Sequence, residues 1–364
     1  PSPGAEGLSP LASLRDITVI APHFKRRLSG VTSTVVQLVP EQVRQGRGIA
    51  TLGPGLPDDL PRMRWSQLPQ LWQRPAGHRW RVWHARRNNE MLVGLLLKAV
   101  LRMPLQLLFT SAAQRSHSSY TKWLLRNMDA VVATSERSGS FLEVPHTVIR
   151  HGVDLDVFHP PRGDEDRLSE TNLPGTHLVG CFGRVRHQKG TDVFVKAMIE
   201  LLPRYPDWTA VVCGRVTAEH QAFGDALKAA VETAGLSDRI VFLGEVDDIK
   251  PWYRRLDLYV APSRNEGFGL TPLEAMASRT AVVASDAGAY AEQIVSGSTG
   301  AVVPAGAYEP LRDAIADYLA DPDLAQAHGE AGLRRVAQDF ALAREAEALD
   351  KVYAGLLSAR RGAK

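Results

Sequence analysis

The stretch "LYVAPSRNEGFGLTPLEAMA", residues 258–277, decides the fold because it joins a buried strand, a glycine-containing loop and a helix start. Its apolar beginning is typical of a strand covered on both faces of a parallel sheet. Its end, "TPLE", reads as a helix start with Thr271 at the N-cap and Glu274 closing a capping box. Capping leaves Glu266 and the loop glycines unexplained. The alternative is a ligand cradle, with free amides in the loop and a carboxylate at each end.

Runs of the same kind recur along the chain at helix-sized intervals. Most are continuously apolar, and helical patterns such as "GTDVFVKAMIELLPRY" separate them. We expect strands at "ITVIAP", "RGIATLG", "WRVWHA", "LQLLFT", "DAVVATS", "HTVIRHG", "HLVGCFG", "TAVVCGR", "IVFLGE", "LDLYVAP", "AVVASDA" and "GAVVP". This alternation predicts an α/β protein with two doubly wound, Rossmann-like domains, each built on a parallel sheet.

The polar, proline-containing segment at residues 158–175 predicts the domain boundary. We expect an N-terminal domain over residues 1–160 and a C-terminal domain over residues 161–342. An amphipathic helix at about residues 343–360 would close the second domain or pack back on the first. Since ligands of doubly wound folds bind at the carboxyl ends of the strands, two such domains facing each other predict a ligand cleft.

Composition is that of a globular protein with a net charge of +3, but residues through Glu165 carry +8 and the remainder −5. The basic half indicates nucleic acid, an acidic substrate or anionic lipid as partner, or simply an arginine-rich surface. Cys181 and Cys213 lie in apolar runs, which favours reduced core residues and a cytoplasmic setting. We expect no secretory signal and no bilayer-spanning run.

Charged residues follow the first strand of the second half, in the loop "GRVRHQKG". Arg184 and Lys189 there suit a diphosphate, although ordinary loop charge is the simpler reading. In the first half, "APHFKRRLSGVTSTVVQLV" is another strand, loop and helix, and the helix opening at Gly30 would present amides to an anion. Asp154 and Asp156 have the spacing of a metal clamp, but their place after a last strand favours capping.

Four histidines follow strands or open the linker: His23, His84, His117 and His151. Each is more often a hydrogen-bonded scaffold residue than a catalyst. His84 stands out because it ends a strand and two arginines follow it closely.

These motifs occur together in the order found in the retaining family-4 glycosyltransferases of the GT-B fold, which the chain resembles. They are the glycine loop near Gly30, "HGVD", "GRVRHQKG", "LYVAPSRNEGFGLTPLEAMA" and "AVVASDAGAYAEQIVSGSTGAVVP". The resemblance covers essentially the whole chain, is strongest over residues 177–304, and in the first half is to bacterial lipopolysaccharide-core mannosyltransferases. It implies transfer of a sugar, most simply mannose from GDP-mannose, onto a lipopolysaccharide-core acceptor.

The resemblance also implies roles for individual residues. Glu266 would contact hydroxyls of the transferred sugar, and Glu274 would contact the nucleotide ribose. Arg184 and Lys189 would hold the diphosphate and stabilise its growing charge, so that neither a metal nor another cofactor is needed. Backbone of the loop would face sugar and phosphate at Gly267, Phe268, Gly269, Leu270 and Thr271.

One position departs from the family pattern. Many relatives carry a histidine after the strand that here reads "LQLLFTSAAQ", where Thr110 or Ser111 stands. We expect His84 to take its place as the first-domain contact to the donor sugar. Asp248 and Lys250 resemble the pair that faces guanine in GDP-mannose users, although an aspartate there equally suits a helix cap.

The expected partners are a nucleotide-sugar donor, an anionic glycolipid acceptor and a membrane surface, with no nucleic acid and no obligate protein partner. Trp65, Trp72, Trp80 and Trp83 would lie at that surface, at the inner face of the bacterial plasma membrane. The alternatives are a UDP-sugar-dependent glucosyl-, galactosyl- or N-acetylglucosaminyltransferase, a glycoside hydrolase with paired carboxylates, and a nucleic-acid-binding protein.

Overall fold

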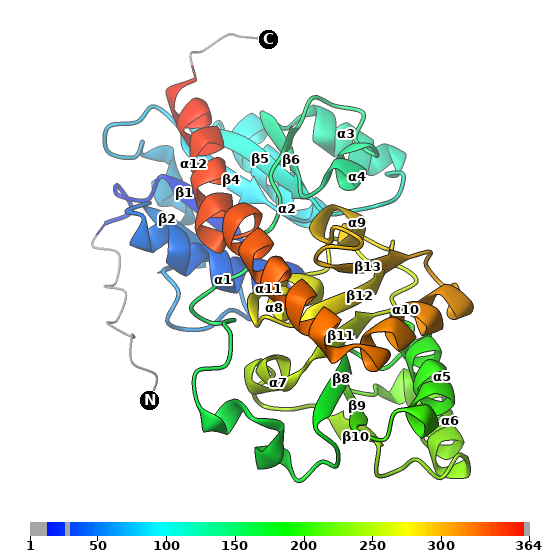
Figure 1. The fold of residues 1–364 in the computed structure, drawn as a ribbon. Helices are drawn as coiled ribbons and strands as arrows, with labels where there is room; N and C mark the ends of the chain where they lie inside the picture. The colour runs from blue at the N-terminus through cyan, green and yellow to red at the C-terminus, as the bar shows by residue number, and fades with distance from the viewer. Residues whose placement is uncertain (1–12, 26–29, 360–364) are drawn as a thin grey trace. The chain divides into compact units, whose positions relative to one another are not determined.

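A computed structural model describes residues 13–25 and 30–359 (Figure 1). Their contacts divide the chain into two compact units, the first running to His151 and resuming at Leu342, the second running from Gly152 to Ala341. The division falls earlier than residue 160 because the backbone joins the second unit at once: the N–H of Val153 donates to the carbonyl of Phe340 at 2.8 Å. The segment expected as a linker packs within the second unit.

The first unit is built on a parallel sheet with strand order β3-β2-β1-β4-β5-β6-β7. Its strands are β1 (Val19–Pro22), β2 (Ile49–Leu52), β3 (Arg62–Met63), β4 (Arg81–Ala85), β5 (Leu105–Ser111), β6 (Ala130–Ala133) and β7 (Thr147–Val148). Its helices are α1 (Gly30–Arg44), η1 (Trp65–Trp72), α2 (Asn88–Leu95), η2 (Leu96–Val100), α3 (Ser119–Arg126), α4 (Glu136–Gly139) and α12 (Leu342–Ser358). Helices α1 and α12 bury one face of the sheet, whereas η1, α2 and α3 bury the other.

Helix α12 returns to the first unit from the far end of the chain (Figure 1). The hydroxyl of Tyr353 lies 2.7 Å from Nδ1 of His84 and accepts from Nε2 of Gln42 at 3.3 Å. Glu345 lies 2.7 Å from Nδ1 of His151. These buried polar contacts fix the helix against the sheet, since breaking any of them would leave a buried polar group unsatisfied.

The second unit is built on a parallel sheet with strand order β10-β9-β8-β11-β12-β13. Its strands are β8 (His177–Phe182), β9 (Trp208–Cys213), β10 (Ile240–Gly244), β11 (Leu258–Ala261), β12 (Ala281–Ser285) and β13 (Gly300–Val303). Its α-helices are α5 (Thr191–Leu201), α6 (Gln221–Thr233), α7 (Lys250–Arg255), α8 (Thr271–Ala277), α9 (Tyr290–Gln293), α10 (Tyr308–Ala320) and α11 (Pro322–Asp339). Its 3-10 turns are η3 (Asp164–Asp166), η4 (Leu168–Thr171), η5 (His187–Lys189), η6 (Leu202–Arg204) and η7 (Ala218–His220).

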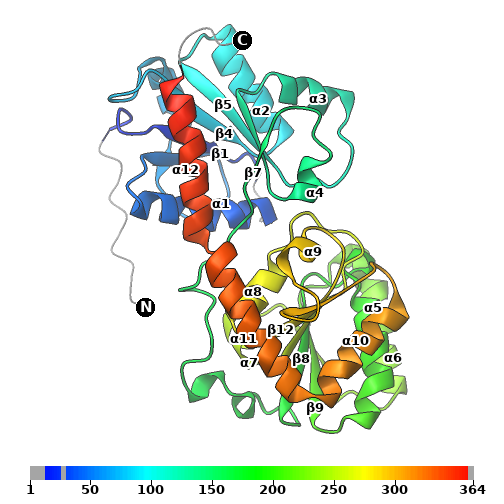
Figure 2. The same ribbon diagram turned by 45° about the horizontal axis from the view of Figure 1, so that its top comes forward.

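The two faces of this sheet carry different helices (Figure 2). Helices α5, α6 and α10 pack on one face, and α7, α8, α9 and α11 pack on the other. Strands β8, β9, β11 and β12 are almost fully buried, which explains why their runs in the sequence read as continuously apolar, whereas the edge strands β10 and β13 are only partly buried. The expected α/β class with two doubly wound parallel sheets is confirmed.

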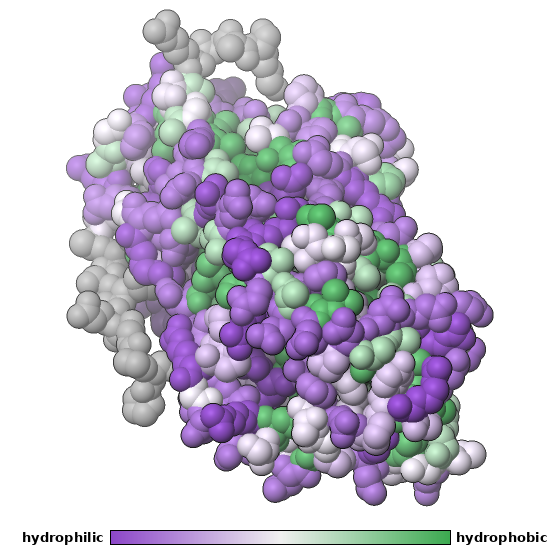
Figure 3. Space-filling model, viewed as in Figure 1, coloured by the Kyte–Doolittle hydropathy of each residue, from purple (hydrophilic) through white to green (hydrophobic). Residues whose placement is uncertain are grey.

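The twelve expected strands are all present, and one further strand, β3, was missed. It has two residues, one exposed and one buried, and so leaves no apolar run to recognise. The face in Figure 3 is largely hydrophilic, with apolar residues in separate patches. Within residues 13–25 and 30–359, no helix combines the length and the hydropathy needed to cross a bilayer.

Candidate functional site

The two loops singled out in the sequence lie side by side because their strands are neighbours. Strands β8 and β11 pair in the middle of the second sheet, and the chain leaves β8 toward β9 on one side and β11 toward β12 on the other. The loops after them therefore meet at the carboxyl edge, at the point where strand order reverses. That point is the usual ligand site of a doubly wound sheet.

An ion pair joins the two loops. The ammonium of Lys189, at the end of η5, contacts Oε2 of Glu266, and both side chains are about four-fifths buried. The other carboxylate oxygen, Oε1, accepts from the N–H of Gly267 at 3.2 Å. The expected catalytic cation and the expected sugar-binding carboxylate thus share one place, and each neutralises the other in the absence of a ligand.

Arg264 fixes the two loops to each other, a contact that the sequence analysis missed. Its guanidinium makes two bonds to the carboxylate of Asp192, at 2.7 and 2.8 Å. The guanidinium also donates to the carbonyl of His187 at 2.6 Å, and the backbone N–H of Arg264 donates to the carbonyl of Gln188. A bidentate pair of this kind restrains geometry as well as adding energy, so Arg264 positions Lys189 and Glu266. No local pattern marks a partner that lies 72 residues away in the chain.

Two glycines let the backbone approach closely at this site. Gly190 has φ = +71°, and a Cβ there would meet the carbonyl oxygen of Pro262 at 1.9 Å. Gly269 has φ = +79°, and a Cβ there would meet the ring of Tyr290 at 2.4 Å. Glycine is therefore required at both positions. Among the described residues, the amides of Gly269 and Leu270 have no hydrogen-bond acceptor, which leaves them available to a ligand.

The capping box expected at the start of α8 is wrong. The helix begins at Thr271 after Leu270, and no side chain caps it. The carboxylate of Glu274 instead accepts from the hydroxyl of Tyr253 at 2.8 Å. Burial raises the pKa of Glu274 to about 7, although the Tyr253 hydroxyl and the Lys189 ammonium oppose that rise. A buried carboxyl that titrates near neutrality is typical of a functional site.

Other expected donor contacts of the second unit are more open. Arg184 is exposed, and no acceptor or carboxylate pairs with it in the described part of the chain. Asp248 and Lys250 form an exposed ion pair of 3.2 Å at the start of α7. Oδ1 of Asp248 also accepts from the N–H of Lys250 at 3.1 Å, but the N-cap residue of α7 is Ile249 and makes no side-chain cap, so Asp248 binds the first helical N–H from one position before the cap. Phe268, in contrast, is buried in the core.

The expected residues of the first unit lie at the carboxyl ends of its strands. His84 is the last but one residue of β4, and its Nε2 lies 2.7 Å from Oγ1 of Thr110 on β5. With Nδ1 bound to Tyr353, both ring nitrogens are occupied and the side chain is 1% exposed. Burial and the charge of Arg86 hold the pKa of His84 well below its usual value. This neutral, engaged ring favours a positioning role for His84.

The remaining expected sites are quickly placed. Ser111 is buried at the end of β5, and Gly30 begins α1, while the loop just before Gly30 lies outside the described residues. Oδ1 of Asp154 accepts from the N–H of Asp156 at 2.9 Å, as expected of a capping aspartate. In the described part of the chain, no three His, Cys, Asp or Glu side chains group as metal ligands.

The second unit matches a described protein family. Residues 164–335 match the family of "Glycosyl transferases group 1". The chain is also 71% identical over 351 residues to the lipopolysaccharide core biosynthesis mannosyltransferase LpcC of Rhizobium leguminosarum bv. viciae, covering 96% of this chain and all of that protein. It is 53% identical over 351 residues to LpsB of Rhizobium meliloti (strain 1021), which bears the same description, covering 95% of this chain and all of that protein.

Solved structures agree on the fold. Alr3699/HepE of Anabaena, in complex with UDP, superimposes with a TM-score of 0.78 at 19% identity, covering 93% of this chain and all of that one. At that identity the likeness bears on fold alone, and it confirms the expected GT-B class. Because full-length relatives at 71% and 53% identity are glycosyltransferases, the chain is a glycosyltransferase and belongs to the group 1 family.

Proposed function

We propose that this enzyme transfers mannose from GDP-mannose to a lipopolysaccharide-core acceptor with retention at the anomeric carbon. The observation that carries the proposal is the Lys189 and Glu266 pair between the β8 and β11 loops, in a chain so similar to two proteins named as lipopolysaccharide-core mannosyltransferases. The anionic acceptor fits the basic first half of the chain.

The donor would enter by exchanging partners with the ion pair. A diphosphate between Arg184 and Lys189 would replace Glu266 at the ammonium, and the freed carboxylate would accept hydroxyl groups of the sugar. The free amides of Gly269 and Leu270 would meet the phosphates. Exchange would keep the Lys189 ammonium paired with an anion and would give the Glu266 carboxylate new hydrogen-bond donors, and this matters because a buried charge without polar partners is costly.

The bond that breaks joins the anomeric carbon to the diphosphate oxygen. Arg184 and Lys189 would offset the negative charge that grows on the leaving GDP, and donors so placed contribute ~3–4 kcal/mol each. The leaving phosphate would take the proton of the acceptor hydroxyl as the new glycosidic bond forms on the same face. With two fixed cations at the diphosphate, we propose that no metal is required.

Guanine would be recognised by Asp248, whose carboxylate can accept from both N1–H and N2–H₂ of that base. One oxygen of the carboxylate already accepts from the N–H of Lys250, so base and backbone would share its two oxygens. The carboxylate of Glu274 would accept a hydrogen bond from a ribose hydroxyl. The hydroxyl of Tyr253 in α7 donates to this carboxylate and so keeps it close to the helix that carries the base contact.

The acceptor would be presented at a membrane, against an exposed apolar patch of the first unit formed by Trp72, Leu96, Val100 and Leu101. The indole N–H of Trp72 donates to the carbonyl of Leu101 at 2.7 Å, which joins η1 to the end of η2. Exposed arginines, Arg74 and Arg102, flank the patch in sequence. Apolar and aromatic side chains beside cations suit an anionic lipid surface, so we place the enzyme at the inner face of the plasma membrane.

Two of the tryptophans first assigned to that surface have other roles. Trp83 is fully buried, and its N–H donates to the carbonyl of Glu90. Trp80 is half-buried, with its N–H on the carbonyl of Ala359. Trp65 and Trp72 are each 51% exposed and remain available to a lipid surface.

The donor assignment predicts that GDP and GDP-mannose raise the melting temperature more than UDP, ADP or their sugars. A ligand at 100-fold its Kd adds ~2.7 kcal/mol to the free energy of unfolding. Asp248→Asn keeps an oxygen for the N–H of Lys250 but lacks the second acceptor, so it should weaken GDP binding and leave UDP binding unchanged. A larger shift with UDP than with GDP would replace the mannose assignment by a UDP-sugar donor.

The titration of Glu274 predicts a pH dependence of GDP affinity. Ribose hydroxyls donate to the carboxylate form, so GDP binding releases a proton whenever Glu274 is protonated beforehand. With a ligand-free pKa of about 7, GDP affinity should rise ~10-fold from pH 6 to pH 8 and then level off. Because burial raises this pKa above its unfolded value, the ligand-free protein should lose stability as pH rises from ~4.5 to 7.

Isothermal titration calorimetry of wild type, Glu274→Gln and Glu266→Gln checks this dependence. GDP itself titrates and contributes part of the pH dependence of its affinity. Glu274→Gln should abolish the rest of that dependence. Glu266→Gln is the matched control: it should keep the pH dependence and bind GDP at least as tightly as the wild type, because the diphosphate no longer competes with a carboxylate for Lys189, yet lose ~10²-fold in turnover. Equal effects of both changes on nucleotide affinity count against this division of roles.

The apolar patch predicts lipid binding. Trp72→Ser and Val100→Ser should each reduce several-fold the fraction of protein that sediments with vesicles containing phosphatidylglycerol, because each removes apolar area from the contact. Val295→Ser, at an exposed valine of the second unit, is the matched control and should change nothing. If all four proteins sediment equally, or if no protein sediments with any vesicle, the proposed membrane contact is wrong.

A further inference from the structure

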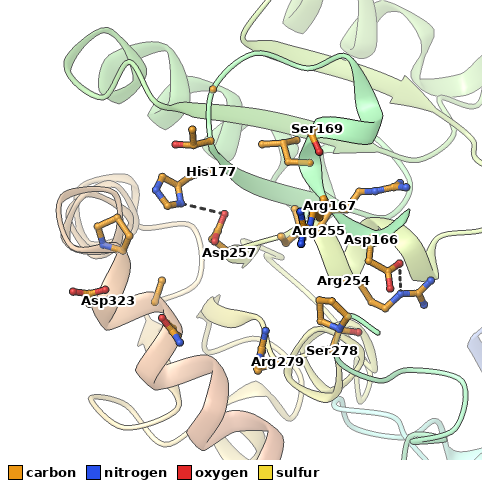
Figure 4. Close-up of a pocket in the computed structure, with 18 residues that line it drawn as sticks. Asp166, Arg167, Ser169, His177, Arg254, Arg255, Asp257, Ser278, Arg279 and Asp323 are labelled. Carbon is orange, nitrogen blue, oxygen red and sulfur yellow. Dashed lines mark hydrogen bonds and ion pairs between the residues drawn. The ribbon is translucent and has the colours of Figure 1, made fainter. Parts of the chain in front are cut away.

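A second candidate site lies in the second unit, at the sheet edge opposite to Lys189 and Glu266. Figure 4 shows the side chains that line it. It is a cavity of about 650 Å³. Its walls include His177 at the start of β8, Asp257 just before β11 and Arg279 just before β12. These are the beginnings of strands whose far ends carry the donor-site loops. The volume is that of a small-molecule pocket.

Four arginines line the cavity: Arg167, Arg254, Arg255 and Arg279. Arg254 is neutralised, because its Nε lies 2.6 Å from Oδ1 of Asp166 and both side chains are largely buried. Arg279 pairs with Glu330 at 3.5 Å and Arg167 pairs with Asp164 at 2.9 Å, but all four of these side chains are exposed, so both pairs are weak. The acidic residues of the lining, Asp166, Asp257 and Asp323, are fewer than its arginines. The cavity therefore favours an anion.

Arg255 gives the strongest indication of a missing partner. Its Nη2 donates to the carbonyl of Glu165 at 2.8 Å, but its Nε is buried and has no acceptor among the described residues. No carboxylate within the described ranges lies at ion-pair distance from it. A buried donor left unsatisfied costs ~1–3 kcal/mol. Because this Nε is closed to solvent in the ligand-free structure, an anion in the cavity would supply the acceptor after a rotation of the Arg255 side chain.

We propose that this cavity binds a small phosphate ester, with the phosphate between Arg255 and Arg279 and the organic body in the remaining volume. Figure 4 shows Arg279 extending from the end of α8 into the cavity, toward the side where Arg255 lies. Guanidinium groups suit this ligand because their N–H groups match phosphate oxygens in pairs. The volume exceeds what a free phosphate fills, which favours an ester.

The same site is placed to influence donor binding, an extension that rests on the proposed function. Arg255 ends α7, which begins at Lys250, while Arg279 follows α8, which contains Glu274. Tyr253 of α7 holds Glu274, and the hydroxyl of Thr280 donates to the carbonyl of Tyr253 at 2.9 Å. A phosphate bridging the two arginines would connect the ends of both helices, and the start of α7 and the middle of α8 carry the expected base and ribose contacts.

Binding is tested by calorimetry with inorganic phosphate, ribose 5-phosphate and ribose, on the whole protein. Ribose 5-phosphate should bind the wild type, and Arg255→Gln and Arg279→Gln should each weaken it about tenfold or more. Arg334→Gln, at an exposed arginine of α11 outside the cavity, is the matched control and should bind normally. Lys189→Ala should also bind normally, which separates the cavity from the donor site.

The arms separate the possible ligands. Tighter binding of ribose 5-phosphate than of inorganic phosphate supports an ester site, whereas equal binding of both overturns the ester and leaves a phosphate site. Equal binding to the wild type, Arg255→Gln and Arg279→Gln, or no binding of any probe, overturns the proposal. None of these measurements uses GDP or sugar transfer, so their outcome is independent of the proposed function.

Coupling is tested by measuring the Kd of GDP with and without saturating ribose 5-phosphate. The bridge predicts a change of about fivefold in the wild type, absent in Arg279→Gln. An unchanged Kd in the wild type overturns the coupling. If another nucleotide proves to be the donor, the same measurement is made with that nucleotide.

Discussion

The structure depends on one ion pair, Lys189 with Glu266, at the point where the order of the second sheet reverses. Two loops from neighbouring strands each bring a charge to a largely buried place, where neither charge alone would be tolerated. Arg264 and Asp192 hold the loops in register with a second, bidentate pair. The ligand-free site is thus electrically balanced and preorganised. A donor would offer Lys189 a second anion, the diphosphate, and would offer Glu266 the hydroxyl groups of the sugar as hydrogen-bond donors.

Helices α7 and α8 extend the influence of that site to the opposite edge of the sheet. Both run back from the donor loops toward the edge where the strands begin, and Tyr253 with Glu274 joins them midway. A largely buried polar contact of this kind couples the two helices, because separating the groups would leave at least one of them poorly satisfied. In the first unit, hydrogen bonds between polar side chains have a different role: Tyr353, His84 and Thr110 are hydrogen-bonded in series, and this network anchors α12.

Much of this was predictable because strand and loop chemistry are local. Continuous apolar runs gave twelve of the strands, and glycine with charge after a strand end identified Lys189, Glu266 and Gly269. What failed depended on contacts between distant residues. Glu274 looked like a capping residue until Tyr253 was seen beside it, and His84 looked available until Tyr353, 269 residues away, occupied its ring. Arg264 carried no sequence signal, and neither did the arginine cavity, whose walls come from five separate segments.

The most direct test of the account is sugar transfer from GDP-mannose to a lipopolysaccharide-core acceptor in EDTA, with wild type, Arg184→Ala and Lys189→Ala. Lys228→Ala, at an exposed lysine of α6, serves as the control. If Arg184 and Lys189 stabilise the leaving diphosphate in place of a metal ion, the wild type should keep full activity in EDTA. Each of the two loop variants should then lose ~10²-fold or more in activity. Activity that disappears in EDTA and returns with Mn²⁺, or near-normal rates in both loop variants, would contradict it.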